Sequence, residues 1–563
     1  MKQYDYVIVG AGSAGCVLAN RLSEKPGISV AVIEAGPSSD SWKVDMPSAL
    51  LYTMHDPNFN WKYYSEPEPY LNNRKIFCPR GKMIGGCSSH NGMVHVRGHA
   101  QDFNRWAQKG LAKWSYNHVL PYFKKLETWS GGENEYRGGD GPLQVSKSKI
   151  NEKFPLYQAV IEAAKEAGYP YTEDPNGFMQ EGFCTYDLTI KDGKRCGIGK
   201  AYLNEALKRK NVDIFMQSQV QKIILEDKVA KGIEVTIKGK KEKIFAGKEV
   251  LISCGAINSP KLLQLSGIGD AKDLQQVGIQ VIHNLPGVGK NLQDHLEIYV
   301  QHECKKPVTL YGLFNNPFKK LYHGVQWFLF KKGLLTHSHL ELGGFVRSST
   351  HFDHPNIQFH FFPSLVINHG LQNPDKHAFQ FHASPNRPTS RGWVKLRTSN
   401  PNDLPKIQFN YLQHAEDIEA FRACVRLSRE IIAQPAMDPY RGKEIQPGES
   451  VIEDEHIDAF VRQAVESAYH PCGTCKMGAR SDSMAVVDSD ARVIGIDGLR
   501  VVDSSVFPTI PNGNLNAPTI MLAERASDLI KGIVPLKPSR VEVKRPDGWA
   551  HSQRSNSPVR EVS

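Results

Sequence analysis

The chain has 563 residues, 40% of them hydrophobic and 23% charged, and a formal net charge of +10. A chain of this length forms two or three domain-sized units around a large buried core. No basic run is interleaved with aromatic residues, so we expect no nucleic-acid partner. Ten cysteines in so long a chain do not form a disulfide framework and favour a reducing compartment. No apolar run approaches the roughly 20 residues of a membrane-spanning helix.

The first element is a β-branched strand that enters a G-x-G-x-x-G loop formed by Gly10, Gly12 and Gly15. The first glycine permits a tight turn, the second lets the backbone approach a pyrophosphate, and the third lets the following helix pack on the strand. A helix over residues 13–24 would present free N–H groups to the phosphates. This order of elements predicts a dinucleotide site.

Glu34 ends the second predicted strand, about 20 residues beyond the glycine loop. A carboxylate there accepts a hydrogen bond from a ribose 2′-hydroxyl and repels a 2′-phosphate, which disfavours NADP. From these residues alone, NAD and FAD both remain open.

The rest of the chain mixes strand and helix signals. Residues 80–91 are rich in glycine and lack apolar periodicity, which predicts an irregular loop. Antiparallel strands leading back to a parallel one are predicted at residues 212–215, 220–225, 231–237 and 249–255. Other expected elements are helices at 100–126, 255–266, 415–433 and 518–531 and strands at 355–362 and 499–503.

An apolar run at residues 321–330 is followed by Lys331 and Lys332. The run predicts a helix, and we interpret it as a helix of the core. A membrane-facing patch is the alternative.

Two glycine-containing loops carry His470 and Asn514 and flank one predicted strand. A histidine could take the hydroxyl proton of an alcohol while an amide steadies the oxygen, and a positioned base contributes roughly 10² to 10⁴-fold in rate. A buried histidine satisfied by hydrogen bonds is the alternative. Cys472 and Cys475 have C-x-x-C spacing, but no second pair matches it, so we predict neither a metal site nor a redox disulfide.

Taken in order, the motifs resemble those of the glucose–methanol–choline flavoprotein oxidoreductases. They are Gly10–Gly15, Gly85–Gly86 with Asn91 and Arg97–Gly98, Gly255–Pro260 with Ser266–Gly267, His470–Pro471, and Asn514. The resemblance covers residues 4 to about 532 and is strongest to the family's choline dehydrogenases, through runs at 291–297, 439–444 and 468–477. It implies FAD as the cofactor and oxidation of choline to betaine aldehyde, the first step of glycine betaine synthesis. Further oxidation to glycine betaine stays open.

The resemblance also implies the architecture. We expect a mixed α/β chain with a Rossmann-like FAD-binding domain and a discontinuous substrate-binding domain built on an antiparallel sheet plus helices. The expected FAD-binding domain comprises residues 1–152, 195–300 and 464–535, and the substrate-binding domain residues 153–194 and 301–463. Residues 536–563 are polar and are predicted to form a disordered tail.

Carried over position by position, the resemblance implies that His470 and Asn514 are catalytic. Hydride would pass from the substrate α carbon to flavin N5. Glu297, His360, Tyr469 and Trp61 match substrate-pocket residues, with Glu297 facing the trimethylammonium group. The implied cofactor residues are Gly10, Gly12, Ser13, Ala14, Gly15, Glu34, Ala35, Arg80, Gly85, Gly86, Ser88, His90, Asn91, Gly92, Met93, Val94, Val220, Asp503 and Asn514.

His90 departs from most of the family, which has an apolar residue at this position. Here the sequence is similar to choline oxidase, in which the matching histidine is bonded covalently to the flavin 8α carbon. The resemblance therefore implies a covalent FAD, and a free histidine beside the dimethylbenzene ring is the alternative. Gly92 stands where choline oxidase has an active-site serine.

The resemblance implies a quinone-type or respiratory-chain electron acceptor, with oxygen as the alternative. It also implies peripheral association with the mitochondrial inner membrane or the bacterial cytoplasmic membrane. No targeting segment is visible, so a cytoplasmic location stays open. Assembly into a homodimer is also left open. Other functions left open are oxidation of a neutral aliphatic alcohol and a catalytically inactive flavoprotein with a binding role.

Overall fold

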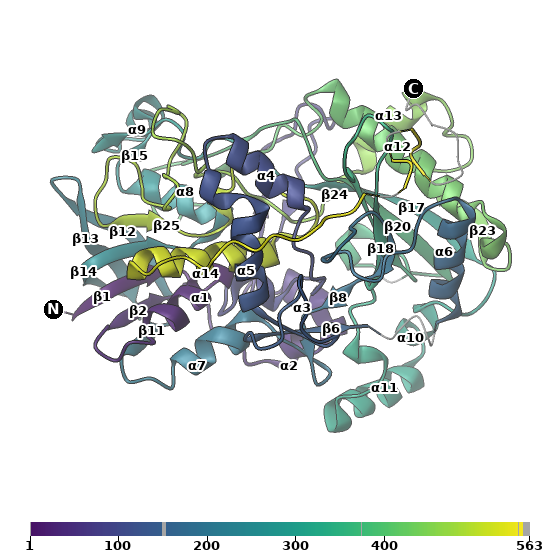
Figure 1. The fold of residues 1–563 in the computed structure, drawn as a ribbon, viewed down its shortest axis with the longest axis horizontal. Coiled ribbons are helices and arrows are strands. Elements are labelled where there is room, and N and C mark those ends of the chain that lie inside the picture. The colour runs from purple at the N-terminus through teal and green to yellow at the C-terminus, as the bar shows by residue number, and fades with distance from the viewer. Residues whose placement is uncertain (1, 149–153, 373, 546, 550, 555–563) are drawn as a thin grey trace.

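The computed structural model describes residues 2–148, 154–372, 374–545, 547–549 and 551–554 (Figure 1). Within these residues, two seven-stranded sheets organise the molecule. The sheet that contains the N-terminal strand lies at the left in Figure 1, and the other lies at the right. The fold is therefore mixed α/β, as the sequence predicts.

The first sheet is mainly parallel. Its order is β11 (Val212–Phe215), β2 (Val30–Ile33), β1 (Lys2–Val9), β14 (Lys240–Ile252), β13 (Val229–Ile237) and β12 (Ser218–Glu226), and β25 (Leu499–Val501) pairs with β14. The first half of β14 pairs antiparallel with β13, and its second half runs parallel to β1 and β25. The predicted antiparallel strands leading back to a parallel one are thus confirmed. β2 is buried along its whole length, as expected of a parallel strand covered on both faces.

Helices cover this sheet. α1 (Ser13–Leu22) packs against α14 (Asn516–Lys531), and α14 packs against α5 (Tyr116–Lys125). Arg21 on α1 donates to the carboxylate of Glu524 on α14, which fixes the two helices together. The helical region predicted at residues 100–126 is interrupted, because α4 (Ala100–Gln108) ends before Gly110, whose φ of +88° does not continue a helix.

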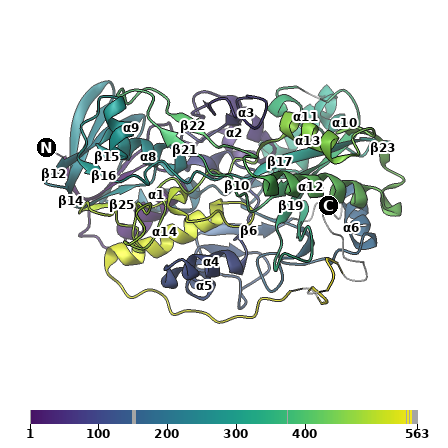
Figure 2. The ribbon, with the colours of Figure 1, turned by 90° about the horizontal axis from the view of Figure 1, so that it is seen from above.

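The second sheet is antiparallel. Its order is β23 (Arg441–Gln446), β17 (Leu296–Cys304), β20 (Ala378–Pro385), β19 (Ile357–Phe362), β18 (Leu342–Val346) and β7 (Gly182–Thr185), and β24 (Glu466–Ser467) pairs with β17. The domain boundary expected after residue 300 falls inside β17. Phe359, Phe361, Phe379 and Phe381 alternate with polar residues and pack in the core with α12 (Ala415–Ile432) and α6 (Pro155–Glu166). α12 packs against β20 and β17, and Figure 2 shows it beside β17.

Shorter elements connect and flank the two sheets. They are α2 (Trp42–Asp45), α3 (Leu50–His55), β3 (Tyr63–Tyr64), β4 (Phe77–Cys78), β5 (Glu127–Trp129), β6 (Leu143–Lys147), β8 (Asp187–Leu188), β9 (Ile190–Lys191), β10 (Lys194–Arg195), α7 (Asn204–Ala206), α8 (Gly255–Leu265), β15 (Ile268–Gly269), α9 (Ala271–Gln276), β16 (His283–Asn284), α10 (Tyr311–Phe314), α11 (Pro317–Phe330), β21 (Trp393–Lys395), β22 (Lys406–Gln408) and α13 (Asp454–Ala464).

The helix predicted at residues 321–330 forms as α11, but the expectation that it lies in the core is wrong. In α11, all of whose residues are described, Trp327 is the only buried side chain. Phe318, Leu321 and Leu329 expose 81%, 66% and 70% of their surfaces. In the part of the chain that the structure describes, no helix is both long enough and apolar enough to cross a bilayer.

The C-terminal segment passes along the body (Figure 2). Ser539 donates through its backbone N–H to Asn117 O on α5, and Lys544 donates likewise to Phe178 O. Further on, Arg554 pairs with Glu430 on α12 at 2.8 Å. The described part of the tail, predicted to be disordered, therefore makes contacts with both halves of the molecule.

Candidate active site

A cavity of about 980 Å³ is bordered by the carboxyl ends of β1 and β2 and by one face of β17, β19 and β20. This volume suits a large cofactor together with a small substrate. Of the residues that the sequence singles out, the cavity is lined by Gly10, Gly12, Ser13, Ala14, Glu34, Ala35, Trp61, Arg80, Gly86, His90, Asn91, Gly92, Met93, Val94, Val220, Glu297, His360, Tyr469, His470, Asp503 and Asn514.

The glycine loop has the geometry that the sequence predicts. Gly10 has φ of +99°, and a Cβ there would lie 2.5 Å from Ser253 O. A Cβ on Gly15 would lie 1.9 Å from Gly10 O, so only glycine lets α1 pack this close to β1. Gly12 is the N-cap of α1 and lines the cavity. The helix N-terminus thus faces the cavity and fits a pyrophosphate.

Three residues of the predicted cofactor set do not line the cavity and support the loops around it instead. Gly15 allows the helix packing just described. Gly85 donates its backbone N–H to Ala11 O at 2.7 Å, and Ser88 Oγ donates to Gly85 O at 2.7 Å. The first bond fastens the irregular loop of residues 80–91 to the glycine loop, and the second stabilises that irregular loop internally.

Glu34 lies at the end of β2 and is buried. One of its carboxylate oxygens accepts the N–H of Ala11 at 2.9 Å, and the other accepts that of Gly36 at 2.7 Å. Burial raises its pKa to about 7, against the opposing effect of these hydrogen bonds. A carboxyl oxygen can accept more than one hydrogen bond, so Glu34 fits a ribose hydroxyl as well.

His90 lies on the cavity wall and exposes only 5% of its surface. Burial lowers its pKa to about 3, and the positive charges of Arg80 and Arg195 act in the same direction, so the ring is neutral. Its Nδ1 is buried without a hydrogen-bond partner among the described residues. An unpartnered buried nitrogen needs an explanation, and a group bound in the cavity would supply one.

His470 and Asn514 lie side by side although they come from different loops. Asn514 Nδ2 lies 3.2 Å from His470 Nε2. Gln358 Nε2 donates to Asn514 Oδ1 at 3.2 Å, so the amide group of Asn514 turns its N–H toward the histidine. His470 Nε2 is therefore the acceptor of this pair.

A second histidine fixes the proton of His470 on the opposite ring nitrogen. His295 Nε2 lies 3.0 Å from Asn386 O, and a carbonyl can only accept, so this nitrogen carries the hydrogen. Burial lowers the pKa of His295 to about 4, and a neutral ring then has a bare Nδ1. This Nδ1 lies 3.1 Å from His470 Nδ1, which must donate. Both lines of reasoning leave His470 Nε2 unprotonated.

The surroundings keep His470 neutral and in place. Burial lowers its pKa well below 6.5, and His295 and Arg80 add to this effect. Its backbone N–H donates to Asp294 Oδ1 at 2.7 Å. The other carboxylate oxygen of Asp294 accepts the hydroxyls of Ser467 and Tyr411. A neutral, positioned histidine of this kind can act as a general base.

Glu297 forms an acidic site on the β17 part of the cavity wall. It accepts a hydrogen bond from Tyr299 OH at 3.0 Å and contacts His382 Nδ1 at 3.2 Å. Burial acts to raise its pKa, but His382, His360 and Tyr299 outweigh this and lower it. Glu297 is therefore a buried carboxylate that remains negatively charged.

The two aromatic residues predicted for the substrate pocket differ in their surroundings. Tyr469 lines the cavity, and its backbone carbonyl accepts from Arg80 Nη2 at 2.6 Å. Trp61 also lines the cavity, but Lys82 Nζ lies 4.9 Å from its ring centroid and Tyr63 stacks against it. A cation already occupies a position over the Trp61 ring.

Sequence reasoning missed Tyr299, His382, Gln358 and His295. The signal for the first three is the alternation of polar and aromatic residues in the strands. Residues two apart in a strand face the same side, so Gln358 and His360 share the side opposite the buried phenylalanines. His382 pairs with His360 across β19 and β20, and with Tyr299 across β17 and β20. His295 carried no comparable signal, because its contact with His470 spans 175 residues.

The C-x-x-C pair lies in the core. Cys472 and Cys475 are both fully buried and free, and burial raises the pKa of each thiol well above 9.0. Among the residues described, no group of three or more His, Cys, Asp and Glu side chains is placed to hold a metal ion.

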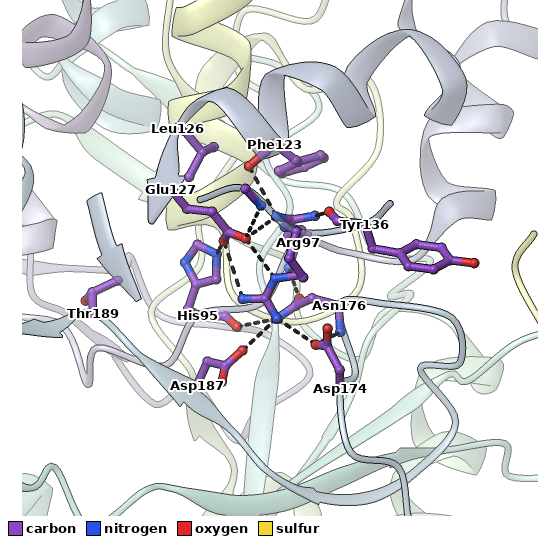
Figure 3. A network of polar contacts seen from close by, with 12 residues as sticks. His95, Arg97, Phe123, Leu126, Glu127, Tyr136, Asp174, Asn176, Asp187 and Thr189 are labelled. Carbon is purple, nitrogen blue, oxygen red and sulfur yellow. Dashed lines mark hydrogen bonds and ion pairs between the residues drawn. The ribbon is translucent and has the colours of Figure 1, made fainter. Parts of the chain in front are cut away.

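A buried ionic cluster anchors the segment that follows His90 (Figure 3). Glu127 accepts from Arg97 Nη2 at 2.5 Å, from Arg137 Nε at 2.7 Å and contacts His95 Nε2 at 3.0 Å. Arg137 also pairs with Asp187 at 2.8 Å. Because His95 and Arg97 directly follow the cavity-lining residues 90–94, the cluster holds that wall of the cavity in place.

Solved structures of known proteins share this architecture. Pyridoxine 4-oxidase from Mesorbium loti is 30% identical, with a TM-score of 0.84 over 93% of this chain and 98% of that one. A variant of formate oxidase from Aspergillus oryzae is 26% identical, with a TM-score of 0.89 over 94% and 98%.

Sequence comparison gives closer relatives. An oxygen-dependent choline dehydrogenase from Vibrio vulnificus is 51% identical over 99% of this chain and 100% of its own length. A mitochondrial choline dehydrogenase from mouse is 50% identical over 97% and 92%. The family models for the N- and C-terminal parts of GMC oxidoreductases match residues 4–297 and 388–523. The chain belongs to the GMC oxidoreductase family.

Proposed function

We propose that this protein is an FAD-dependent enzyme that oxidises choline to betaine aldehyde. The observation that carries the proposal is one cavity with both an unprotonated His470 Nε2 beside the Asn514 amide and the buried carboxylate of Glu297. The named activity of relatives that are about half identical over nearly the whole chain supports the same substrate.

Three features of the cavity fit FAD. The N-terminus of α1 would face the pyrophosphate, Glu34 would accept from a ribose hydroxyl, and the buried Nδ1 of His90 lacks a partner among the described residues. When bound, FAD supplies a two-electron acceptor for the hydride of the alcohol carbon. In this proposal, residues 1–152, 195–300 and 464–535 form the FAD-binding domain, and residues 153–194 and 301–463 form the substrate-binding domain.

His470 and Asn514 have different roles at the hydroxyl group of the alcohol. A hydroxyl between them would donate its proton to His470 Nε2 and accept a hydrogen bond from Asn514 Nδ2. As the proton leaves, the oxygen becomes negative, and the Asn514 N–H and the new imidazolium both stabilise it. Because both side chains are already held by Gln358 and His295, little reorganisation is needed.

Glu297 gives the pocket its preference for a cationic substrate. A trimethylammonium group cannot donate a conventional hydrogen bond, so it is bound by charge and by aromatic faces. Glu297 supplies the charge, and Tyr469 supplies an aromatic surface on the same cavity. Trp61 already contacts Lys82, so we place the headgroup on the Glu297 side.

His90 is the residue we propose to carry the FAD covalently. Its ring is neutral and lies on the cavity wall, and its Nδ1 is free of hydrogen bonds to the described residues. In a neutral imidazole one ring nitrogen carries a lone pair, which is what a histidine needs to form a bond to the flavin ring system.

For the electron acceptor we propose a quinone-type molecule rather than oxygen. In support, the exposed part of the cavity lining includes Leu51, Tyr52 and Leu371, which are 40%, 61% and 60% exposed, so apolar side chains border its opening. An apolar acceptor would be favoured at such an opening.

The test is anaerobic mixing of the purified holoenzyme with choline while the flavin absorbance is recorded. We expect rapid bleaching with choline and much slower bleaching with its neutral isostere, in which a tert-butyl group replaces trimethylammonium. Equal rates would favour a neutral alcohol substrate, and no bleaching with either would favour a binding protein. Adding a soluble quinone or oxygen to the bleached enzyme then identifies the acceptor.

A further inference from the structure

The exposed side of α11 carries an apolar stripe. Phe318, Leu321, Tyr322, Val325, Phe328 and Leu329 follow a helical spacing of three and four residues and expose 44–81% of their surfaces. Soluble proteins rarely leave a contiguous apolar patch of this kind in water unless it binds something. We call these six residues the α11 face.

The α11 face continues onto α2 and α3. The ring of Trp42 lies 5.7 Å from that of Phe328 and 5.6 Å from that of Tyr52. Trp42 and Tyr52 are themselves 42% and 61% exposed. Figure 1 shows α11 at the lower edge of the molecule, on the same side as α2 and α3. The aromatic residues thus join three helices into one surface.

The opposite side of α11 is fixed to the body. Trp327 is buried, and its indole Nε1 donates to Gly193 O at 2.9 Å. Trp327 is the one buried side chain among the residues described for α11, and the α11 face points outward. The helix therefore lies on the surface as an amphipathic helix whose apolar side is exposed. Such a helix can lie in the interface plane of a bilayer.

The charged residues of the segment that carries α11 have one sign. From residue 304 to residue 340 the sequence contains six lysines and no aspartate or glutamate. Lys319, Lys320 and Lys332 are exposed at the two ends of the helix. Each lysine near an acidic membrane surface contributes about 1 kcal/mol to binding. Aromatic and basic residues together are typical of a membrane-interface segment.

The same charge argues against a second copy of the chain as the occupant. A two-fold dimer through the α11 face would bring the lysines of both copies into one interface, because the two sides of such an interface use the same patch. Like charges facing each other oppose association. An acidic lipid surface matches both the apolar stripe and the lysines.

The cavity opens beside this surface. Tyr52 and Lys320 belong to or border the α11 face and also line the cavity, together with Leu51 and Leu371. We propose that the α11 face docks onto an acidic lipid bilayer and brings the mouth of the cavity to the membrane. The docking itself does not depend on which alcohol the enzyme oxidises, although the access it gives to a lipid-dissolved acceptor rests on the proposed function.

The test is sedimentation of the holoenzyme with lipid vesicles. We expect binding to vesicles that contain phosphatidylglycerol, weaker binding to phosphatidylcholine alone, and release by salt. Leu321→Ser with Leu329→Ser should weaken binding at least tenfold, and Lys319→Gln with Lys332→Gln should weaken binding to the acidic vesicles only. The matched control is Ile533→Ser with Val534→Ser, which removes two exposed apolar side chains beyond the far end of α14.

Flavin absorbance and dye-coupled choline oxidation without vesicles check that each variant is folded, since none of the substituted residues lines the cavity. Binding that the Leu321 and Leu329 substitutions leave unchanged, or that the control loses equally, overturns the proposal. So does a dimer in size-exclusion chromatography that only the α11 double variant loses, since that would assign the face to a second copy. Loss of vesicle binding with retained choline oxidation supports it.

Discussion

His295 Nδ1 lies 3.1 Å from His470 Nδ1, and the carbonyl of Asn386 fixes the proton on the other side of the His295 ring. The position of the proton on His470 is therefore set by a residue that does not line the cavity. A histidine base needs the correct ring nitrogen to be bare, and His295 makes Nε2 that nitrogen.

His295→Leu should therefore lower kcat for choline by about 10- to 100-fold, the usual cost of losing a partner that orients a functional side chain. Without an acceptor at Nδ1, His470 can carry its proton on Nε2. A protonated Nε2 cannot accept the hydroxyl proton of the substrate. The pH profile of the reductive rate should shift as well, which a merely structural defect would not cause. Stopped-flow flavin reduction across a pH series measures both effects.

The control for His295→Leu is His302→Gln. His302 lies on β17, the strand that begins directly after His295, and is buried, but it contacts Gly442 and Glu444 rather than the cavity. A rate and a pH profile equal to those of the parent are expected for this control. If His295→Leu behaves in the same way, the tautomer argument is wrong.

The local geometry around the glycine loop could be predicted from the sequence. Gly15 is required by a contact within one strand–turn–helix unit, because a Cβ there would meet Gly10 O, and such a contact follows from neighbouring residues. The positive φ of Gly10 also belongs to this turn, whereas its close approach to Ser253 joins segments that are distant in sequence. His470 and Asn514 could also be paired, because both flank the strand β25 in sequence. What could not be predicted is the set of contacts between distant segments, such as His295 with His470 and Gln358 with Asn514.

The exposure of α11 could not be read from the sequence for a different reason. The apolar spacing of residues 321–330 defines a helix with one apolar side, but it does not say what that side faces. In the structure the single buried contact is Trp327, and the apolar side faces outward. Periodicity determines the helix, whereas only tertiary packing determines its orientation.

Glu297→Gln should raise the Kd for choline at least about tenfold, equivalent to ~1.4 kcal/mol, because the cationic headgroup loses its charged partner. The neutral isostere should bind almost equally to both forms. Titration of flavin absorbance with a non-reacting choline analogue, and KM values for the two alcohols, provide the measurements. Glu303→Gln is the matched control, since Glu303 lies at the other end of β17 and pairs with Lys376 at the surface.

His90→Ala should convert a covalently held flavin into a dissociable one. Acid precipitation of the parent protein is expected to leave the yellow colour in the pellet, and precipitation of the variant should release it into the supernatant. The substitution removes the imidazole ring, which contains the nitrogen proposed to form the bond. Complete release of the colour from the parent protein would show that His90 is a free histidine.

Glu127→Gln should destabilise the fold by about 3–5 kcal/mol at pH 7, because Arg97 and Arg137 would keep their charges in the core without the carboxylate. Burial acts to raise the pKa of Glu127, but the two guanidinium groups and His95 outweigh it and hold the folded pKa well below the usual value. A lowered folded pKa contributes stability above the unfolded pKa of about 4.3, and this contribution is lost as the pH falls from there toward the folded pKa.

The difference in stability between the parent and Glu127→Gln should therefore be largest near neutral pH and shrink below about pH 4. Urea unfolding followed by tryptophan fluorescence at several pH values measures it as a change in midpoint. Glu133→Gln is the control, because Glu133 pairs with Lys124 at 3.4 Å with 65% of its side chain exposed. An exposed pair of this kind contributes at most about 1 kcal/mol. If both variants unfolded at the same urea concentration, the buried cluster would not be what holds the segment between His90 and Arg97 in place.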